Sequence, residues 1–334
     1  MGYSERNQIP LSNLQLRKSF AKLLRRRRKV RPGWLLAIYG DEWQSGWAFC
    51  HSDTAVDVET GNGPALDART IPPEKMTSQV DSLLNEIQRR LDNEQPQFIG
   101  LCMPDSSRRV FQRRLAQVWP EAETISISDA ERLIDPGEFP VGVVLYADLR
   151  AFAVGRRLDG YTWISGDWPV PLGSGGSLYE LALLTIGSVL EIRDGRQKPS
   201  MLRGSLLEVL GFQDFDGLLM WLYTGAKQEP DRLVKIVDLL SGAAASGDPL
   251  AVRLVNVVGN SLGACVTACL EQLGLTQDET VVRVGGRVLQ LHRIVPAIMN
   301  RVQYANENVV FQSVEFTQTG RQTLSALQIK INEE

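Results

Sequence analysis

Apolar positions in the first part of the chain switch between strand-like and helix-like spacing. Short apolar runs separated by turn residues come first, and apolar residues then recur at i, i+3, i+4, i+7 and i+11 from Val80 to Leu91. The pattern predicts strands at 34–40, 46–52, 55–61, 98–103 and 124–128, and helices at 80–91 and 107–118. The element order is therefore β-β-β-α-β-α-β.

The same order begins again after residue 137. It predicts strands at 141–146, 151–156, 161–165, 280–284 and 309–313. A long helical region at about 177–240 interrupts the repeat, and Asp248 and Pro249 are the N-cap and first residue of the next helix. A further helix ends near residue 303, and a closing helix starts at 322.

Two copies of this order describe an α/β chain with the duplicated ribonuclease-H-like architecture of actin-like ATPases and sugar kinases. We expect two lobes around a cleft, with a helical insertion in the second lobe. The predicted domains are a basic arm at 1–32, a first lobe at 33–137 and a second lobe at 138–334. The last helix could pack back on the first lobe.

Composition narrows the class of protein. The chain has 334 residues, of which 43% are hydrophobic and 22% charged, and this excludes a disordered or disulfide-stapled protein. No apolar run reaches the roughly 18 residues that a membrane span needs, and no signal-like block follows the N-terminal basic residues. Its four cysteines and two histidines follow no metal-ligand spacing. We expect a cytoplasmic protein without a metal site of its own.

Charge is distributed unevenly. Residues 1–32 hold ten Lys and Arg against Glu5 alone, a net charge of +9, so residues 33–334 must carry −12 to give the whole-chain value of −3. An apolar stripe of Leu16, Phe20, Leu23 and Leu24 runs through this arm at helical spacing. The arm predicts an anionic partner, which would be an acidic protein, a lipid surface or a nucleic acid. Packing of the arm on its own body, or peripheral attachment to a membrane, is equally compatible with the pattern.

A series of motifs resembles one family. In chain order they are Gly100–Asp105, Ser128-Asp129-Ala130, Gly155-Arg156, Asp159-Gly160, Gly166-Asp167-Trp168, Gly173–Ser177, Ser246–Pro249 and Gly285-Gly286-Arg287. Their order and spacing resemble the BadF/BadG/BcrA/BcrD ATPase and N-acetylglucosamine kinase family of actin-like ATPases. The resemblance spans about residues 34–330.

The resemblance implies roles for particular residues. Asp105 would be the general base that takes a proton from a substrate hydroxyl, and Ser128 and Asp129 would line a sugar pocket. The nucleotide contacts would be Gly40, Gly173, Gly175, Gly176, Gly285 and Gly286. ATP and Mg²⁺ would be the cofactors of an active member, and a small sugar-like molecule would be the ligand of the cleft.

Each of these residues also has a structural interpretation. Asp105 could be a helix N-cap with Arg108 as its ion-pair partner, and Asp129 could cap the turn that it begins. The glycine run at 173–177 could be a plain turn or an anion site at a helix start. Gly285 and Gly286 could serve close packing.

Departures from the family pattern fall at both phosphate loops. The first loop reads Tyr39-Gly40-Asp41-Glu42-Trp43-Gln44-Ser45, and the second reads Tyr146-Ala147-Asp148-Leu149-Arg150-Ala151. The family has glycines there, because backbone amides must approach phosphate without intervening side chains. Ser174 and Gly175 also replace an aspartate-glutamate pair. We therefore expect weak or no ATP binding.

Two functions follow. The favoured one is a catalytically degenerate binding or assembly module, and the alternative is an active ATP-dependent kinase of an amino sugar or related hydroxyl substrate, or an ATPase, with unusual phosphate contacts. The sequence also leaves a homodimer open.

Overall fold

The computed structural model describes residues 32–41, 43–53, 57–69, 71–134, 139–168, 175–224, 229–277, 279–314 and 319–333. The prediction of a helical basic arm falls on residues 1–31, which lie outside the described residues, as does Gly173.

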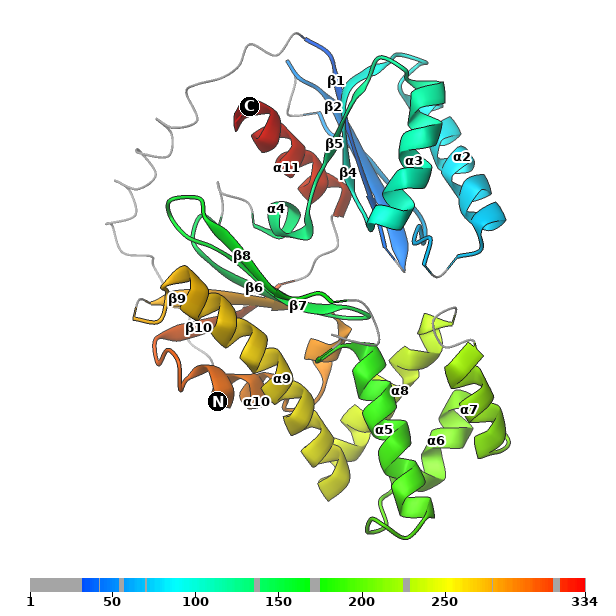
Figure 1. The fold of residues 1–334 in the computed structure, drawn as a ribbon, viewed down its shortest axis with the longest axis vertical. Coiled ribbons are helices and arrows are strands. Elements are labelled where there is room, and N and C mark those ends of the chain that lie inside the picture. The colour runs from blue at the N-terminus through cyan, green and yellow to red at the C-terminus, as the bar shows by residue number, and fades with distance from the viewer. Residues whose placement is uncertain are drawn as a thin grey trace.

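A five-stranded mixed sheet organises the first lobe (Figure 1). Its elements are β1 (Trp34–Gly40), β2 (Gln44–His51), β3 (Glu59–Pro64), α2 (Pro73–Arg90), β4 (Pro96–Cys102), α3 (Asp105–Val118), β5 (Glu123–Ser126) and α4 (Asp129–Leu133). The strand order is β3-β2-β1-β4-β5, with β1 antiparallel to β2 and parallel to β4. Parallel β1, β4 and β5 therefore end at the same edge of the sheet.

The period of two along β1 divides its side chains between two layers. Leu36 and Ile38 pack under α2 and α3 on one face, whereas Leu35 and Ala37 face the other. That second face is covered by α11 (Thr319–Glu333), whose Leu327 is completely buried there. The closing helix of the chain thus packs on the first lobe, far from its neighbours in sequence (Figure 1).

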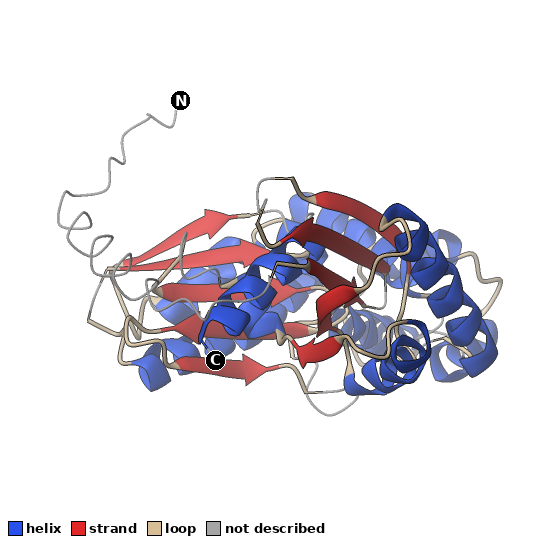
Figure 2. Cartoon of the chain, turned by 90° about the horizontal axis from the view of Figure 1, so that it is seen from above, coloured by secondary structure: helices blue, strands red, loops and turns tan. Residues whose placement is uncertain are grey.

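The second lobe repeats the sheet. Its elements are β6 (Gly142–Ala147), β7 (Ala151–Arg156), β8 (Thr162–Gly166), α5 (Leu178–Arg193), α6 (Leu202–Leu210), α7 (Phe215–Thr224), α8 (Pro230–Ala245), α9 (Pro249–Leu273), β9 (Thr280–Gly285), the 3₁₀ turn η1 (Arg287–Gln290), α10 (Ile294–Val302) and β10 (Val309–Ser313). The strand order is β10-β9-β6-β7-β8. Read from the other edge, as β8-β7-β6-β9-β10, it matches the order β3-β2-β1-β4-β5 of the first sheet strand for strand. Seen from above, the strands of both sheets lie among helices (Figure 2). The predicted two-lobed α/β fold is confirmed.

The long helix α9 is the central helix of the second lobe. Asp248 caps it by accepting hydrogen bonds from the amides of Leu250 and Ala251, and Pro249 is its first residue, as the sequence predicts. Gly259 and Gly263 let α10 approach closely, since a Cβ at Gly259 would lie 2.5 Å from that of Ala297. Within the described part of the chain, α9 is the one helix long and apolar enough to cross a membrane, and half of its most apolar window is buried inside the protein. Its burial is that of a core helix.

Sequence-predicted boundaries differ from the structure in a few places. The third strand begins at Glu59 rather than at residue 55, and α11 begins three residues before Gln322. The short helix α4 was not predicted, because five residues are too few to show helical periodicity.

Candidate functional site

A cavity of about 420 Å³ lies where the two lobes meet. Its first-lobe wall comes from the carboxyl ends of β1, β4 and β5, and its second-lobe wall from Arg150 and the β8 hairpin. Four residues predicted from the sequence line it together, namely Gly40, Asp105, Ser128 and Asp129. The structure therefore brings the predicted base and the predicted sugar-pocket residues to one site.

Asp105 stands at the rim of this cavity as the first residue of α3. Its carboxylate is 77% exposed and pairs with Arg108 one turn later, which also donates to Ser126. The alternative interpretation of Asp105 as an N-cap is wrong, because Pro104 occupies that position and no side chain caps the helix. The ion pair with Arg108 is present as expected.

Ser128 begins α4 through a capping box. Its hydroxyl accepts from the amide of Glu131, and the Glu131 carboxylate accepts from the Ser128 amide at 2.6 Å and hydroxyl at 2.7 Å. Lys330 of α11 holds the other oxygen of Glu131 at 2.7 Å. Ser128, and not Asp129, is thus the cap, so the turn-capping interpretation of Asp129 is wrong.

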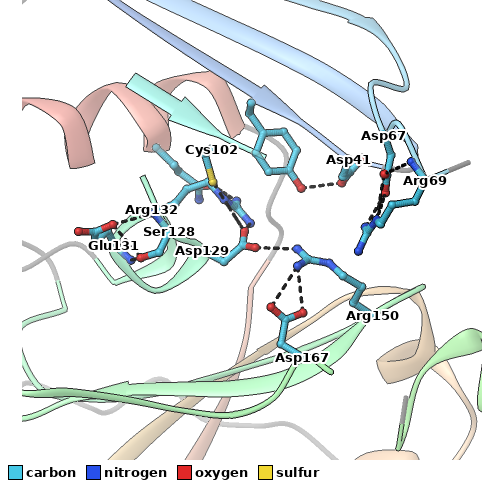
Figure 3. Close-up of polar contacts among 12 residues, drawn as sticks. Asp41, Asp67, Arg69, Cys102, Ser128, Asp129, Glu131, Arg132, Arg150 and Asp167 are labelled. Atoms are coloured by element: carbon cyan, nitrogen blue, oxygen red, sulfur yellow. Dashed lines mark hydrogen bonds and ion pairs between the residues drawn. The ribbon is translucent and has the colours of Figure 1, made fainter. Parts of the chain in front are cut away.

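Capping by Ser128 leaves the Asp129 carboxylate available for other contacts, and two arginines take it (Figure 3). Arg132 of the same helix donates to Oδ1 at 2.8 Å, and Arg150 of the second lobe donates to Oδ2 at 2.6 Å. Burial acts to raise the pKa of Asp129, but Arg150 and Arg132 outweigh it and hold that pKa far below its ordinary value. Asp129 is therefore a largely buried carboxylate that is ionised at neutral pH.

Arg132 fixes Asp129 to the first lobe. Its side chain is 1% exposed, lies 4.6 Å over the ring of Tyr39 and donates to Gln322 of α11 at 3.1 Å. Beside it, burial raises the pKa of the Cys102 thiol, and the negative charge of Asp129 adds to the rise. Cys102 is consequently a neutral wall residue and not a thiolate nucleophile.

Arg150 connects the two lobes. Besides its bond to Asp129, its guanidinium donates to both oxygens of Asp167 at 2.9 and 3.2 Å (Figure 3). Burial raises the pKa of Asp167, and Arg150 offsets only part of that rise. One cation thus bridges a carboxylate from each lobe.

In the first altered phosphate loop, the Asp41 carboxylate takes up the backbone amides. Its Oδ1 accepts from the amides of Trp43 and Gln44, both at 2.8 Å, and its Oδ2 accepts from the Tyr39 hydroxyl at 2.5 Å. Asp41 is only 5% exposed. A buried carboxylate therefore already satisfies the amides of this turn.

The second altered loop is arranged in the same way. Asp148 is also 5% exposed and accepts from the amides of Leu149 at 2.9 Å and Arg287 at 3.3 Å. The Arg287 guanidinium pairs with it at 3.2 Å. Burial raises the pKa of Asp148 and nearby Asp41 raises it further, while Arg287 offsets only part of the rise. The two loops thus place two carboxylates close together at the junction of the lobes.

Trp43 reaches across this junction. The Arg287 guanidinium lies 3.8 Å from the centre of the Trp43 ring, which brings the first phosphate loop against the residue that follows the glycine pair of the second lobe. The sequence placed Trp43 in the altered loop but indicated no partner for it.

The predicted glycine contacts separate into two groups. Gly176 donates its amide to the Glu180 carboxylate, and a Cβ there would lie 2.3 Å from Leu262. Gly286 has a φ of +113°, and a Cβ there would lie 2.2 Å from the Ala147 carbonyl oxygen. Both positions require glycine for close packing, whereas Gly40 borders the cavity.

Gly175 and Gly285 adjoin these tight positions. A Cβ at Gly175 would make an ordinary 3.8 Å contact with Ser261, and Gly285 ends β9. Neither lines the interlobe cavity of about 420 Å³.

A larger hollow of about 650 Å³ lies between α9 and α10 on the second lobe, and none of the predicted site residues that the structure describes lines it. Among the residues that the structure describes, no group of three or more His, Cys, Asp or Glu side chains is arranged to hold a metal ion.

Sequence reasoning missed the arginines. Arg132 follows Asp129 by three residues, so helical spacing would have paired them had α4 been predicted. The Arg150–Asp129 pair joins different lobes and carried no local signal.

Comparison with known proteins gives relatives at low identity. No family model matches the chain. The chain is 22% identical over 246 residues to an N-acetylmuramic acid/N-acetylglucosamine kinase of Clostridium acetobutylicum, covering 71% of this chain and 79% of that protein. It is 26% identical over 149 residues to an N-acetyl-D-glucosamine kinase of Dictyostelium discoideum, covering 44% of this chain and 47% of that one.

Solved structures show the same fold. A proposed N-acetylglucosamine kinase of Chromobacterium violaceum aligns with a TM-score of 0.65 at 18% identity over 89% of this chain and 99% of that one. A hexokinase of Schistosoma mansoni complexed with glucose aligns with a TM-score of 0.52 at 13% identity over 90% of this chain and 86% of that one.

Proposed function

We propose that the chain, which is similar to N-acetylglucosamine kinases in sequence and fold, is a ligand-binding module that no longer transfers phosphate. Its cleft would take a small, hydroxyl-rich ligand of the amino-sugar class. ATP would bind weakly or not at all.

One observation carries the proposal: internal carboxylates occupy both phosphate loops. Amides of Trp43 and Gln44 are bonded to Asp41, and amides of Leu149 and Arg287 are bonded to Asp148. Backbone amides at such turns are the groups that cradle phosphate in nucleotide-binding loops. Here a phosphate would have to displace a buried side chain before it could be bound.

Charge adds to this obstacle. A carboxylate about 4 Å from a phosphate oxygen costs about 4 kcal/mol at an effective dielectric of 20. Two carboxylates, Asp41 and Asp148, lie at this junction. A bound cation would offset the repulsion, but it would not release the amides.

The ligand half of the cleft supports retained binding. Its cavity has room for a small molecule and offers carboxylates as hydroxyl acceptors at Asp105 and Asp129. Relatives are named as kinases of N-acetylglucosamine and N-acetylmuramic acid, so an amino sugar is the ligand class that their names suggest.

An active kinase is the second candidate, and Asp105 is the observation that favours it. Its exposed carboxylate at the cavity rim is where a base would meet a substrate hydroxyl. Such an enzyme would use ATP and Mg²⁺, and it would need to hold phosphate without the amides of the two loops.

Calorimetric titration with magnesium-ATP and, separately, N-acetylglucosamine, together with a turnover assay, tests the proposal. We expect heat from the sugar, none from magnesium-ATP, and no turnover. Micromolar binding of magnesium-ATP with sugar-dependent turnover that is lost in Asp105→Asn would overturn the proposal in favour of the kinase. Asp105→Asn is a clean probe because the exposed side chain contributes little to the fold.

A further inference from the structure

Asp129, Arg150 and Asp167 form a continuous ion-pair chain across the cleft, which we call the clasp (Figure 3). The Asp129 end is rigid, because Arg132 holds its Oδ1 and the capping box fixes the start of α4. The other end is carried by the bend between β6 and β7 and by the residue after β8. The Arg150–Asp129 bond is the member of the clasp that crosses between lobes.

The position of the clasp matters because all three side chains line the interlobe cavity. Oδ1 of Asp129 already accepts two bonds from Arg132, at 2.8 and 3.2 Å. Its Oδ2 accepts from Arg150 at 2.6 Å. A carboxylate oxygen has about two acceptor positions, and Arg132 takes both of those on Oδ1. A ligand hydroxyl that donates to Asp129 must therefore approach Oδ2, where it competes for space with the Arg150 guanidinium.

Asp167 gives Arg150 an alternative position. The Arg150–Asp167 pair lies within the second lobe and uses the Nη1 nitrogen of Arg150, whereas Nη2 contacts Asp129. This pair is unaffected by relative movement of the lobes. Arg150 can therefore release Asp129 without being left as an unpaired cation, which would be costly in a half-buried site.

From this geometry we infer that Arg150 is a built-in competitor of the cleft ligand and a lock between the lobes. Without ligand, Arg150 bridges Asp129 and Asp167 and holds the cleft closed. A ligand that takes Asp129 leaves Arg150 paired with Asp167 and unlocks the lobes. The ligand part of this inference rests on the proposed function, whereas the lock is a property of the free protein.

Two other contacts also join the lobes. Trp43 of the first lobe lies against Arg287 of the second. Ile134, between β5 and β6, packs with Phe152 and Val154 of the second sheet. The lobes therefore stay joined by these contacts when the clasp opens.

Pulsed electron spin resonance between the two lobes tests the lock. Spin labels would be attached at Arg113→Cys on α3 and Met220→Cys on α7, both exposed. Cys265 would be replaced by serine, because the other three cysteines are buried. The variants are Arg150→Met, which removes the clasp cation but keeps the aliphatic stem, and Asp167→Asn, which keeps the bond between lobes.

We expect a narrow distance distribution in the parent protein and in Asp167→Asn, and a longer or broader one in Arg150→Met. Arg157→Met is the matched control, since Arg157 is an arginine of the same lobe whose pair with Asp159 is exposed. An Arg150→Met distribution identical to that of the parent would overturn the lock. Equal opening in Asp167→Asn and Arg150→Met would overturn it too.

Competition is tested with N-acetylglucosamine as the probe sugar. Arg150→Met should bind it more tightly than the parent, on the order of tenfold. Equal or weaker binding by Arg150→Met would overturn the competition. If neither protein bound the sugar, the proposed function would fail, and the distance measurement, which needs no ligand, would still decide the lock.

Discussion

Replacing Asp129 with asparagine would remove one charge from the centre of the interlobe network while keeping the shape of the side chain. Arg132 would then lose its carboxylate in a place where its side chain is only 1% exposed. Its other contacts, the ring of Tyr39 and the amide oxygen of Gln322, are neutral. We therefore expect Asp129→Asn to destabilise the protein strongly.

The size of the effect follows from the burial of the pair. Breaking a buried ion pair by removing one partner costs about 3–5 kcal/mol, because the remaining charge is uncompensated. Arg150 loses less, since it keeps Asp167. For a chain of this length, the loss corresponds to a fall in melting temperature on the order of 10 °C.

Thermal unfolding followed by circular dichroism measures the change. Asp159→Ala is the matched control, because it removes an aspartate–arginine pair that is exposed on the hairpin between β7 and β8. Equal melting temperatures for Asp129→Asn and Asp159→Ala would refute the reasoning, because a buried pair would then contribute no more than an exposed one.

The difference in melting temperature between wild type and Asp129→Asn should depend on pH in one direction. Asp129 has a pKa below its unfolded value of about 3.9. Its contribution to stability is therefore fully present above that value and is lost as the pH falls through the lower, folded pKa. The gap in melting temperature between wild type and Asp129→Asn should be constant from pH 7 to 5 and narrow only below about pH 4. A gap that closes already between pH 7 and 5 would contradict the ion-pair assignment.

Three further results are expected. Gly286→Ala should lower the melting temperature, because Gly286 has a φ of +113° and a Cβ there would lie 2.2 Å from the Ala147 carbonyl oxygen. Gly187→Ala is the control and should not lower it, because there is open space around a Cβ at that position. Leu327→Ala should lower the free energy of unfolding by about 2–5 kcal/mol in chemical denaturation. It should also speed hydrogen exchange in β1, because α11 covers that strand, and unchanged exchange would contradict this packing. Asp105→Asn should leave the melting temperature unchanged, and a fall of several degrees would mean that the exposed Asp105–Arg108 pair stabilises the fold more than its exposure allows.

The sequence predicted the repeated fold because its strands are short, apolar and separated by turn residues. Strands 151–156 and 309–313 agree with β7 and β10 residue for residue. Asp248 and Pro249 mark the start of α9 because capping is a local interaction. The return of α11 to the first lobe was left open, since nothing within a helix of 15 residues specifies which distant sheet it covers.

The candidate site was only partly predictable. The resemblance to a family brought Asp105, Ser128 and Asp129 together, and they line one cavity. The charges that control Asp129 were missed, because Arg150 is 21 residues away and belongs to the other lobe.

The altered loops were recognised from the sequence, and their effect was attributed to the loss of glycines, which places side chains between the backbone amides and phosphate. The structure adds that Asp41 and Asp148 accept hydrogen bonds from the loop amides themselves. Hydrogen bonds of this kind depend on backbone geometry, which residue types alone do not determine.

A crystal structure determined with excess Mg²⁺ and a non-hydrolysable ATP analogue tests the central claim most directly. The account predicts no phosphate density at the junction of the lobes, with Asp41 still bonded to the amides of Trp43 and Gln44 and Asp148 to that of Leu149. Phosphates bound to those amides, with the two carboxylates turned away or coordinating the metal, would contradict it.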